Sequence, residues 1–187
     1  MKICIFGSGN GTNAQRISEY FANHPTIHVD SIIYNKKEAY IAQRAHNLGI
    51  DAQYFGWNDF YHSDRVLEFL KQRNIDAIIL AGFLWLVPSN LLQAYPDRIV
   101  NIHPALLPKY GGKGMFGEHV HEAVIAHRET ESGITIHLVN EHYDEGQHLF
   151  QAHCVVTPED TPDTLAAKIH QLEQTHFPVV IENWLNK

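Results

Sequence analysis

The sequence is poor in cysteine and has no long apolar run, and each shortage excludes a class of protein. Its two cysteines, Cys4 and Cys154, are too few for a disulfide framework, so we expect both thiols to be reduced. No stretch approaches the ~18 consecutive apolar residues that mark a membrane-spanning helix. The N-terminus also lacks the basic segment and following apolar segment of a secretion signal. We therefore expect a cytoplasmic protein that does not bind membranes.

Basic residues are scarce as well: 14 Lys and Arg stand against 21 Asp and Glu, which gives a formal net charge of -7. Proteins that coat nucleic acids usually carry a basic excess, so this balance argues against a nucleic-acid partner. The hydrophobic share of 44% is that of an ordinary globular protein, and 187 residues fit one domain. The unusual count is 14 histidines, as many as Lys and Arg together.

The apolar pattern predicts strands and helices in alternation up to residue 102. Strands are expected at 1–6, 28–34, 51–55, 76–81 and 98–102, and helices at 14–21, 38–48 and 63–73. Such alternation is typical of an α/β fold with a doubly wound, mostly parallel sheet. In the helix at 63–73 we expect Val66, Leu67 and Leu70 to face inward.

The pattern changes after Ile102. Residues 103–118 hold two prolines and four glycines, which favours a long functional loop. A helix at 119–127 follows, and then two strands at 133–139 and 149–156 that we expect to be antiparallel additions at a sheet edge. A final helix at 162–185 is expected to bend before Pro178.

The glycine-rich segment 7–13 lies between the first predicted strand and the first predicted helix. Such turns let backbone N–H groups approach an anion at a helix N-terminus, so a phosphate is the natural ligand. A dinucleotide fits less well, because the Gly-x-Gly-x-x-Gly pattern that starts at Gly7 requires glycine where Thr12 stands. No acidic residue ends the second strand at 34–37 to hold a ribose diol. An ordinary tight strand–helix turn stays open as an alternative.

Asn101 and His103 alternate at the end of a predicted strand, so their side chains point to the same side. An amide can donate to a developing oxyanion, and an imidazole can shuttle a proton near neutral pH. Asp144 lies in a polar loop between two later strands, and near His103 its charge would favour the imidazolium. A structural histidine and a solvated turn aspartate are the alternatives.

Four motifs occur in order along the chain: Ser-Gly-Asn-Gly-Thr-Asn at 8–13, Leu-Ala-Gly-Phe at 80–83, Asn-Ile-His-Pro-Ala-Leu-Leu-Pro-Lys-Tyr at 101–110, and Asp-x-Gly at 144–146. With them nearly the whole sequence resembles the phosphoribosylglycinamide formyltransferases, a branch of the folate-dependent formyltransferase family. The resemblance implies a Rossmann-like formyltransferase fold in one domain over 1–187. Its phosphate-binding half would be at about 1–100 and its folate-binding, catalytic half at about 80–187.

The resemblance also implies a reaction: a formyl group passes from 10-formyltetrahydrofolate to the amine of glycinamide ribonucleotide in purine synthesis, through a tetrahedral intermediate. Asn101 would hydrogen-bond the oxyanion, His103 would stabilise it and donate a proton, and Asp144 would keep His103 protonated. No covalent intermediate with the enzyme is needed, so we interpret Cys4 and Cys154 as packing residues.

Binding residues carry over from the family by position. Gly11, Thr12 and Asn13 would contact the substrate phosphate, and His170 and Glu173 would lie at its ribose side. The folate would lie against Leu84, Trp85, Leu86, Val87 and Asn101, with the loop Asn140, Glu141, His142, Tyr143 and Asp144 closing over it. The bond between Leu107 and Pro108 is expected to be cis.

The sequence departs from the family at four places, the first being Ala105, where members often have serine. No arginine at 59–65 aligns with the one that contacts the folate tail in some members. The usual Asp-Gly-Gly-Pro reads Asp144-Glu145-Gly146-Gln147, which predicts a stiffer loop, and the glycine-rich segment 109–115 suggests a mobile lid.

Three other functions compete with this one. His119, His121 and Asp144 could serve a metal-dependent hydrolase, although a His-x-His pair at a helix start does not share one helix face. A folate- or nucleotide-binding module without turnover is the second. The third is a tRNA-formylating enzyme, whose known members carry an extra domain for which 187 residues leave no space. We expect no metal, small-molecule partners only, and a monomer or homodimer.

Overall fold

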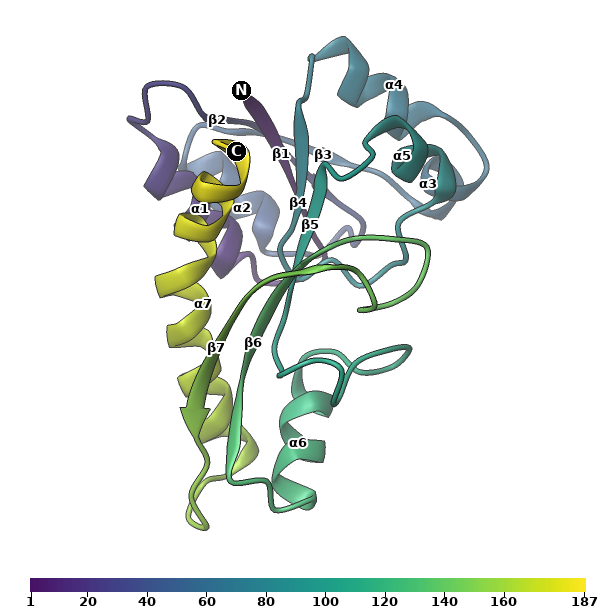
Figure 1. The fold of residues 1–187 in the computed structure, drawn as a ribbon. Helices are drawn as coiled ribbons and strands as arrows, with labels where there is room; N and C mark the ends of the chain where they lie inside the picture. Colours follow the sequence, from purple (N-terminus) through teal and green to yellow (C-terminus); the bar gives the residue numbers. More distant parts are fainter. The chain divides into compact units, whose positions relative to one another are not determined.

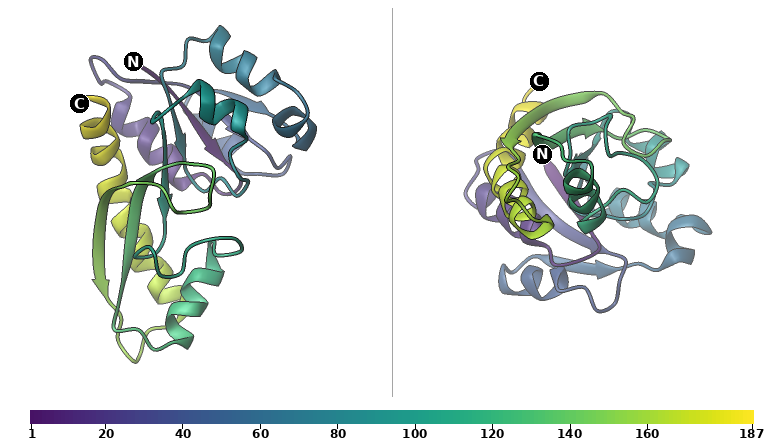
Figure 2. Two further views of the ribbon diagram at one scale, coloured as in Figure 1. Left: turned by 45° about the vertical axis from the view of Figure 1, so that its right-hand side comes forward. Right: turned by 90° about the horizontal axis from the view of Figure 1, so that it is seen from below.

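The computed structural model describes all 187 residues, which divide into two compact units, Met1–Val100 and Asn101–Lys187 (Figures 1 and 2). Strand β5 (Ile99–His103) begins in the first unit and ends in the second. The strand order is β3-β2-β1-β4-β5-β6-β7. None of the helices combines the length and apolar character that crossing a membrane requires. A single domain over 1–187 stays a prediction.

The first unit is built on a parallel sheet. Strand β1 pairs in parallel with β2 and β4, and β2 pairs in parallel with β3. Ile3, Cys4, Ile5 and Phe6 of β1 are all fully buried, as expected of a central parallel strand covered on both faces. The strands are β1 (Lys2–Gly7), β2 (His28–Tyr34), β3 (Asp51–Tyr54) and β4 (Ala77–Leu80).

Helices cover both faces of this sheet, with α1 and α2 on one side and α3, α4 and α5 on the other (Figure 1). Their bounds are Thr12–Phe21, Ile41–Asn47, Trp57–Tyr61, Arg65–Gln72 and Ser89–Ala94. The strand order reverses between β1 and β4, and in doubly wound sheets ligands bind beyond the carboxyl ends of the strands at such a point. The predicted doubly wound, mostly parallel sheet is confirmed.

The second unit adds an antiparallel pair, β6 (Glu131–Leu138) and β7 (His148–Val155). Helix α7 (Pro162–Leu185) lies along both strands, and α6 (Glu118–Ala126) packs against α7 (Figures 1 and 2). Thr161 caps α7 by accepting a hydrogen bond from the Thr164 N–H. The predicted antiparallel additions are therefore confirmed. Helix α7 continues through Pro178, and the bend before that residue stays a prediction.

Two short helices, α3 and α5, were not predicted. Helix α3 spans only five residues, so it has too few turns for a helical apolar period, and its start depends on the Asp59 carboxylate, which accepts from the Gly56 N–H at 2.8 Å. The predicted helix at 38–48 begins only at Ile41, after a turn. In α4, Val66 and Leu70 are buried as predicted, whereas Leu67 is half-buried.

The cysteines and one peptide bond agree with expectation. Both thiols are free, and burial raises the pKa of the Cys4 thiol to about 12. Cys4 is fully buried and Cys154 half-buried, so Cys4 is a packing residue of β1. The peptide bond between Leu107 and Pro108 is cis, as predicted.

Gly133 of β6 gives a test of how closely this strand pair approaches. A β-carbon at this position would lie 1.9 Å from the Ala152 carbonyl oxygen on β7 and 2.7 Å from Leu106 Cδ2. Gly133→Ala should therefore lower the free energy of unfolding by about 3 kcal/mol, at the upper end for overpacked sites. Chemical denaturation measures this loss. Gly9→Ala, where a β-carbon meets nothing within 4 Å, is the control, and equal stability of the two variants would contradict the strand geometry.

Candidate active site

Four polar side chains meet in the second unit, and we call Asn101, His103, His137 and Asp144 the polar cluster. His103 Nδ1 lies 3.5 Å from Asp144 Oδ2, and His137 Nε2 lies 3.5 Å from Asp144 Oδ1. Asn101 Nδ2 is 3.1 Å from His137 Nε2. Asn101 and His103 come from the end of β5, where alternation along the strand turns both to one side, as the sequence predicts. The structure therefore brings the three predicted catalytic residues together.

Asp144 reaches the polar cluster through a tight loop between β6 and β7. Its own backbone has φ 57°, in the left-handed region, and the Gly112 N–H donates to its Oδ2 at 3.0 Å. Gly146 lets the loop pass close to β6, because a β-carbon there would lie 1.7 Å from the Leu138 carbonyl oxygen. A glycine is thus required at 146 for Asp144 to face the histidines.

His137 is the member of the polar cluster that sequence reasoning left without a role. Its Nδ1 is 2.8 Å from the Leu138 carbonyl oxygen, which can only accept, so the neutral ring carries its proton there. Nε2 then accepts from the Asn101 amide and so fixes which way that amide points. Strand alternation could have pointed to His137 in the sequence, because Thr135 and His137 are alternate residues of β6 and therefore share one side of the strand. Both are buried.

His103 is buried, with 3% of its surface exposed, and both of its ring nitrogens face acceptors. Nε2 is 2.7 Å from the Tyr110 carbonyl oxygen, opposite the nitrogen that faces Asp144. Burial lowers the pKa of His103 below its ordinary value, although Asp144 and the Tyr110 carbonyl act in the other direction. Asp144 thus raises the pKa of His103 as expected, but burial lowers that pKa by more. In the free protein near pH 7 the ring is therefore mostly neutral, with its proton on Nε2.

The Asp144 carboxylate stays ionised. Burial raises its pKa, but the His137 and His103 imidazoles and the Gly112 N–H together bring the pKa below its ordinary value. A fixed negative charge thus faces His103 Nδ1. It stabilises any proton that arrives on that nitrogen.

Helices α6 and α7 contribute further titratable groups to the second unit. His170 Nδ1 lies 3.6 Å from Glu173 Oε2, which raises the pKa of His170. Burial lowers the pKa values of His103 and His121, and the charge of Glu173 acts against this shift in both. His121 is buried, and its Nδ1 has no hydrogen-bond partner. His119 is exposed and pairs with Glu122.

The predicted phosphate loop lies in the first unit, between β1 and α1. Gly11 has φ 81°, and a β-carbon on it would lie 2.6 Å from Ile41 Cγ1 of α2, so only glycine fits. Arg44 holds the loop from α2, since its Nε donates to the Asn10 carbonyl at 2.8 Å. Thr12 and Asn13 begin α1, whose N-cap makes no side-chain hydrogen bond.

The predicted folate segment, Leu84–Val87, is attached to this loop within the first unit. The Leu84 N–H donates to Ser8 Oγ at 3.0 Å, and Tyr61 Oη donates to the Leu86 carbonyl at 2.6 Å. Trp85 packs in an aromatic cluster, with ring centroids 5.2 Å from Trp57 and 5.5 Å from Phe60. Sequence reasoning missed the contribution of α3, since this helix was not predicted.

The loop predicted to close over the folate is exposed in the second unit. Asn140, Glu141, His142 and Tyr143 lie at the surface, and the Asn140 side chain accepts from the His142 N–H at 2.9 Å. Arg65, which sequence alignment could not assign, forms an ion pair with Asp59. No cluster of three or more His, Cys, Asp and Glu side chains is placed to hold a metal ion.

A family model described as formyl transferase matches residues 1–181. The chain belongs to the formyl transferase family. It is 38% identical to a chloroplastic phosphoribosylglycinamide formyltransferase of Arabidopsis thaliana, covering 96% of this chain and 64% of the relative. It thus spans less than two thirds of that relative's length.

Two relatives from Bacillus species match over nearly their full lengths. A phosphoribosylglycinamide formyltransferase of Bacillus subtilis is 30% identical, with 98% of this chain and 94% of the relative covered. The crystal structure of the protein of the same name from Bacillus halodurans superposes with a TM-score of 0.89 at 34% identity, covering 100% of this chain and 96% of that one. The predicted resemblance is confirmed.

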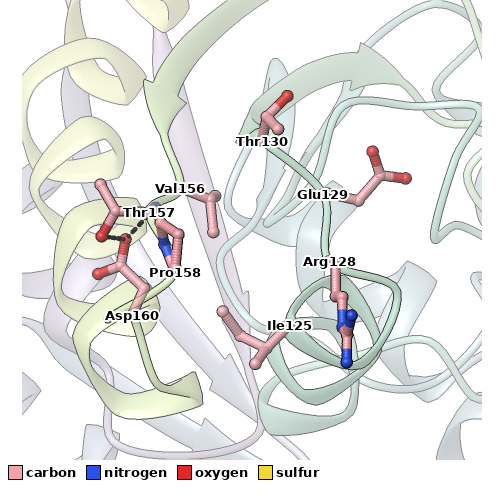
Figure 3. Close-up of a pocket in the computed structure, with 8 residues that line it drawn as sticks. All are labelled: Ile125, Arg128, Glu129, Thr130, Val156, Thr157, Pro158 and Asp160. Atoms are coloured by element: carbon pink, nitrogen blue, oxygen red, sulfur yellow. Dashed lines mark hydrogen bonds between the residues drawn. The ribbon is translucent and has the colours of Figure 1, made fainter.

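A cavity of about 500 Å³ lies elsewhere in this formyl transferase, in its second unit. In Figure 3, Arg128 and Glu129 stand on one side of it, and Thr157 and Asp160, joined by a hydrogen bond, on the other. No member of the polar cluster lines it. This cavity therefore does not coincide with the polar cluster.

The charge of Asp144 can be tested on His103 directly. Asp144→Asn removes a charge that raises the pKa of His103, so that pKa should fall further below its ordinary value. The imidazolium would then persist only at lower pH. An NMR titration of the histidine resonances measures the change. Glu145→Gln, which removes an exposed carboxylate next along the chain, is the control, and an unshifted titration in Asp144→Asn would refute the pairing.

Proposed function

We propose that this formyl transferase moves a formyl group from 10-formyltetrahydrofolate to the amine of glycinamide ribonucleotide, a step of purine synthesis. The observation that carries the proposal is the polar cluster, in which an oriented amide, a histidine and an ionised carboxylate meet. The names of the bacterial and plant relatives support the choice of substrates. Both partners are small molecules, and the proposed location is the cytoplasm, as a monomer or homodimer.

Asn101 is the oxyanion donor in this proposal. An asparagine amide has two N–H groups, and one of those on Asn101 is taken by His137 Nε2. The second remains for the substrate. When the amine attacks the formyl carbon, the carbonyl electron pair moves onto oxygen, and this N–H stabilises the resulting negative charge. His137 holds the donor in place before the reaction begins.

His103 moves the proton. Its Nδ1 is unprotonated in the free protein, so it accepts a proton from the attacking nitrogen and forms an imidazolium beside the Asp144 carboxylate. The imidazolium then protonates the nitrogen of the donor as the carbon–nitrogen bond breaks. The products are tetrahydrofolate and the formylated ribonucleotide, and no bond to the enzyme is formed. Neither cysteine takes part.

The remaining predicted residues bind the two substrates. Loop residues Gly11, Thr12 and Asn13 would hold the phosphate with backbone N–H groups at the start of α1, where the helix dipole favours an anion. His170 and Glu173 would bind the ribose side. The folate donor would lie against Leu84–Val87, whose backbone is held by Ser8 and Tyr61, and Asn140–Asp144 would close over it.

His103→Ala should lower kcat by at least about 100-fold, the scale expected for a positioned proton carrier. Purified protein with both substrates is assayed by the absorbance change on release of tetrahydrofolate. His153→Ala removes an exposed histidine that pairs only with Glu131 and should keep full activity. Omitting the ribonucleotide separates transfer from hydrolysis of the donor. Near-normal turnover in His103→Ala would remove His103 from the mechanism.

Glycinamide ribonucleotide should raise the melting temperature, because a ligand that binds only the folded state stabilises it by about 2.7 kcal/mol at 100 times Kd. For a chain of this size that corresponds to a shift of roughly 5–10 °C. Differential scanning fluorimetry measures the shift. The same compound without its phosphate is the control and should shift the melting temperature much less. Equal shifts would show that the phosphate loop does not bind the substrate.

A further inference from the structure

Tyr110 holds the side of His103 that faces away from Asp144. Its carbonyl oxygen lies 2.7 Å from His103 Nε2, and its backbone has φ 56°, an unfavourable left-handed conformation for a residue with a β-carbon. A carbonyl only accepts, so this contact keeps the proton on Nε2 and leaves Nδ1 as the nitrogen that gains and loses one. Something must hold Tyr110 in this conformation.

Glu129 provides that anchor. It lies between α6 and β6, where its Oε1 accepts from the Tyr110 hydroxyl at 2.8 Å. The Lys109 ammonium contacts both oxygens of the same carboxylate, at 3.0 and 3.3 Å. One carboxylate thus holds two successive residues of the loop that follows β5. Glu129 is thus linked to His103 through Tyr110, whose hydroxyl binds Glu129 and whose carbonyl oxygen contacts His103 Nε2.

The charges of the pair keep the direction of this hydrogen bond constant near neutral pH. Burial and the neighbouring Glu129 raise the pKa of Tyr110 to about 12, so its hydroxyl stays protonated. The hydrogen bonds from Lys109 and Tyr110 lower the pKa of Glu129, so its carboxylate stays charged. The Tyr110 hydroxyl is therefore the donor and Glu129 the acceptor at pH values around neutrality.

Packing restrains the Tyr110 ring on one side, where its centroid lies 5.7 Å from that of His127, but not on every side. A cavity of about 100 Å³ lies beside Tyr110, lined also by Leu106, Val124 and the buried hydroxyl of Ser132, which has no hydrogen-bond partner. The ring therefore has space to move once its hydroxyl is released. Its position depends on the bond to Glu129.

We propose that Glu129 and Tyr110 are positioning residues, which fix the orientation and tautomer of His103 from the side opposite Asp144. Neither touches the substrates in this proposal, since Glu129 acts only through Tyr110. The consequence for turnover rests on the proposed formyl transfer. The consequence for the imidazole ring does not, because it is a property of the free protein.

Other charged groups also act on His103, and the variants must leave them in place. Asp144 from the β6–β7 loop and Glu173 from α7 favour its charged form, whereas His137 of β6 and His121 of α6 oppose it. None of these four residues is hydrogen-bonded to Glu129 or to the Tyr110 side chain. Changes at 129 and 110 therefore leave these four groups in place, and Tyr110→Phe also leaves the Lys109–Glu129 contact intact.

The test uses Glu129→Gln, Tyr110→Phe and the double variant, with Glu131→Gln as the matched control. Glu131 is an exposed glutamate two residues further on that pairs only with His153. Long-range ¹H–¹⁵N NMR of the free enzyme reports which nitrogen of His103 carries the proton. Wild type and Glu131→Gln should show the Nε2–H form alone, and the other variants a mixture with Nδ1–H and a lower pKa.

Kinetics supply the second measurement. Misplacing a catalytic group by a small distance should lower kcat of Glu129→Gln and Tyr110→Phe by about 10- to 100-fold, with little change in either KM. The double variant should be no slower than Tyr110→Phe, because both substitutions break the same hydrogen bond, the one between the Tyr110 hydroxyl and Glu129. Glu131→Gln should match wild type.

An unchanged tautomer of His103 in Tyr110→Phe would overturn the proposal, and so would additive losses of kcat in the double variant. A wild-type protein without formyl transfer would instead contradict the proposed function. The NMR arm would then still decide the positioning role, because it needs no substrate. A shifted tautomer of His103 together with a normal kcat would also contradict the proposal that Glu129 and Tyr110 are positioning residues.

Discussion

The second unit depends on holding one buried imidazole between two acceptors. His103 has the Asp144 carboxylate on one nitrogen and the Tyr110 carbonyl on the other. A buried ring can keep both neighbours only if each is held rigidly, because burial works against the charged form that they favour. Much of the surrounding backbone serves that requirement. Asp144 and Tyr110 both take left-handed conformations, which few residues with a β-carbon adopt.

The framework around the polar cluster is made of strand edges and buried hydroxyls. Thr135 of β6 accepts from the Leu107 N–H at 3.0 Å and donates to the Ala105 carbonyl at 2.7 Å, so the segment after β5 is tied to the sheet. Gly146 lets the β6–β7 loop touch Leu138. Each device fixes backbone near a functional side chain, as preorganised catalysis requires.

The first unit meets a different constraint, the close approach of the glycine loop to helix α2. Gly7 and Gly11 both lie against Ile41, and a β-carbon on either would collide with that side chain. Ser8 links the same loop to Leu84, so the predicted phosphate and folate segments share one support within the unit. An acidic protein can hold an anionic substrate in this way, because the helix N-terminus supplies local positive potential that the net charge does not describe.

Local patterns in the sequence determined most of the strands and longer helices, since apolar periodicity and the glycine loop are local features. The same patterns placed Asn101 and His103 on one side of β5, because alternation along a strand needs no tertiary information. Family motifs added Asp144 and the substrates. These patterns did not predict helices α3 and α5, because both helices are too short to show a helical period of apolar residues.

Only the tertiary structure decided what surrounds His103. The roles of His137, Tyr110 and Glu129 arise from contacts between residues 7 to 36 positions apart, for which no spacing rule exists. The balance that leaves His103 neutral also depends on burial, which a sequence motif does not measure. The sequence alone thus determined the fold class and the residue types of the proposed active site. Packing decided the charge state of His103, because the pKa of an imidazole is set by its surroundings.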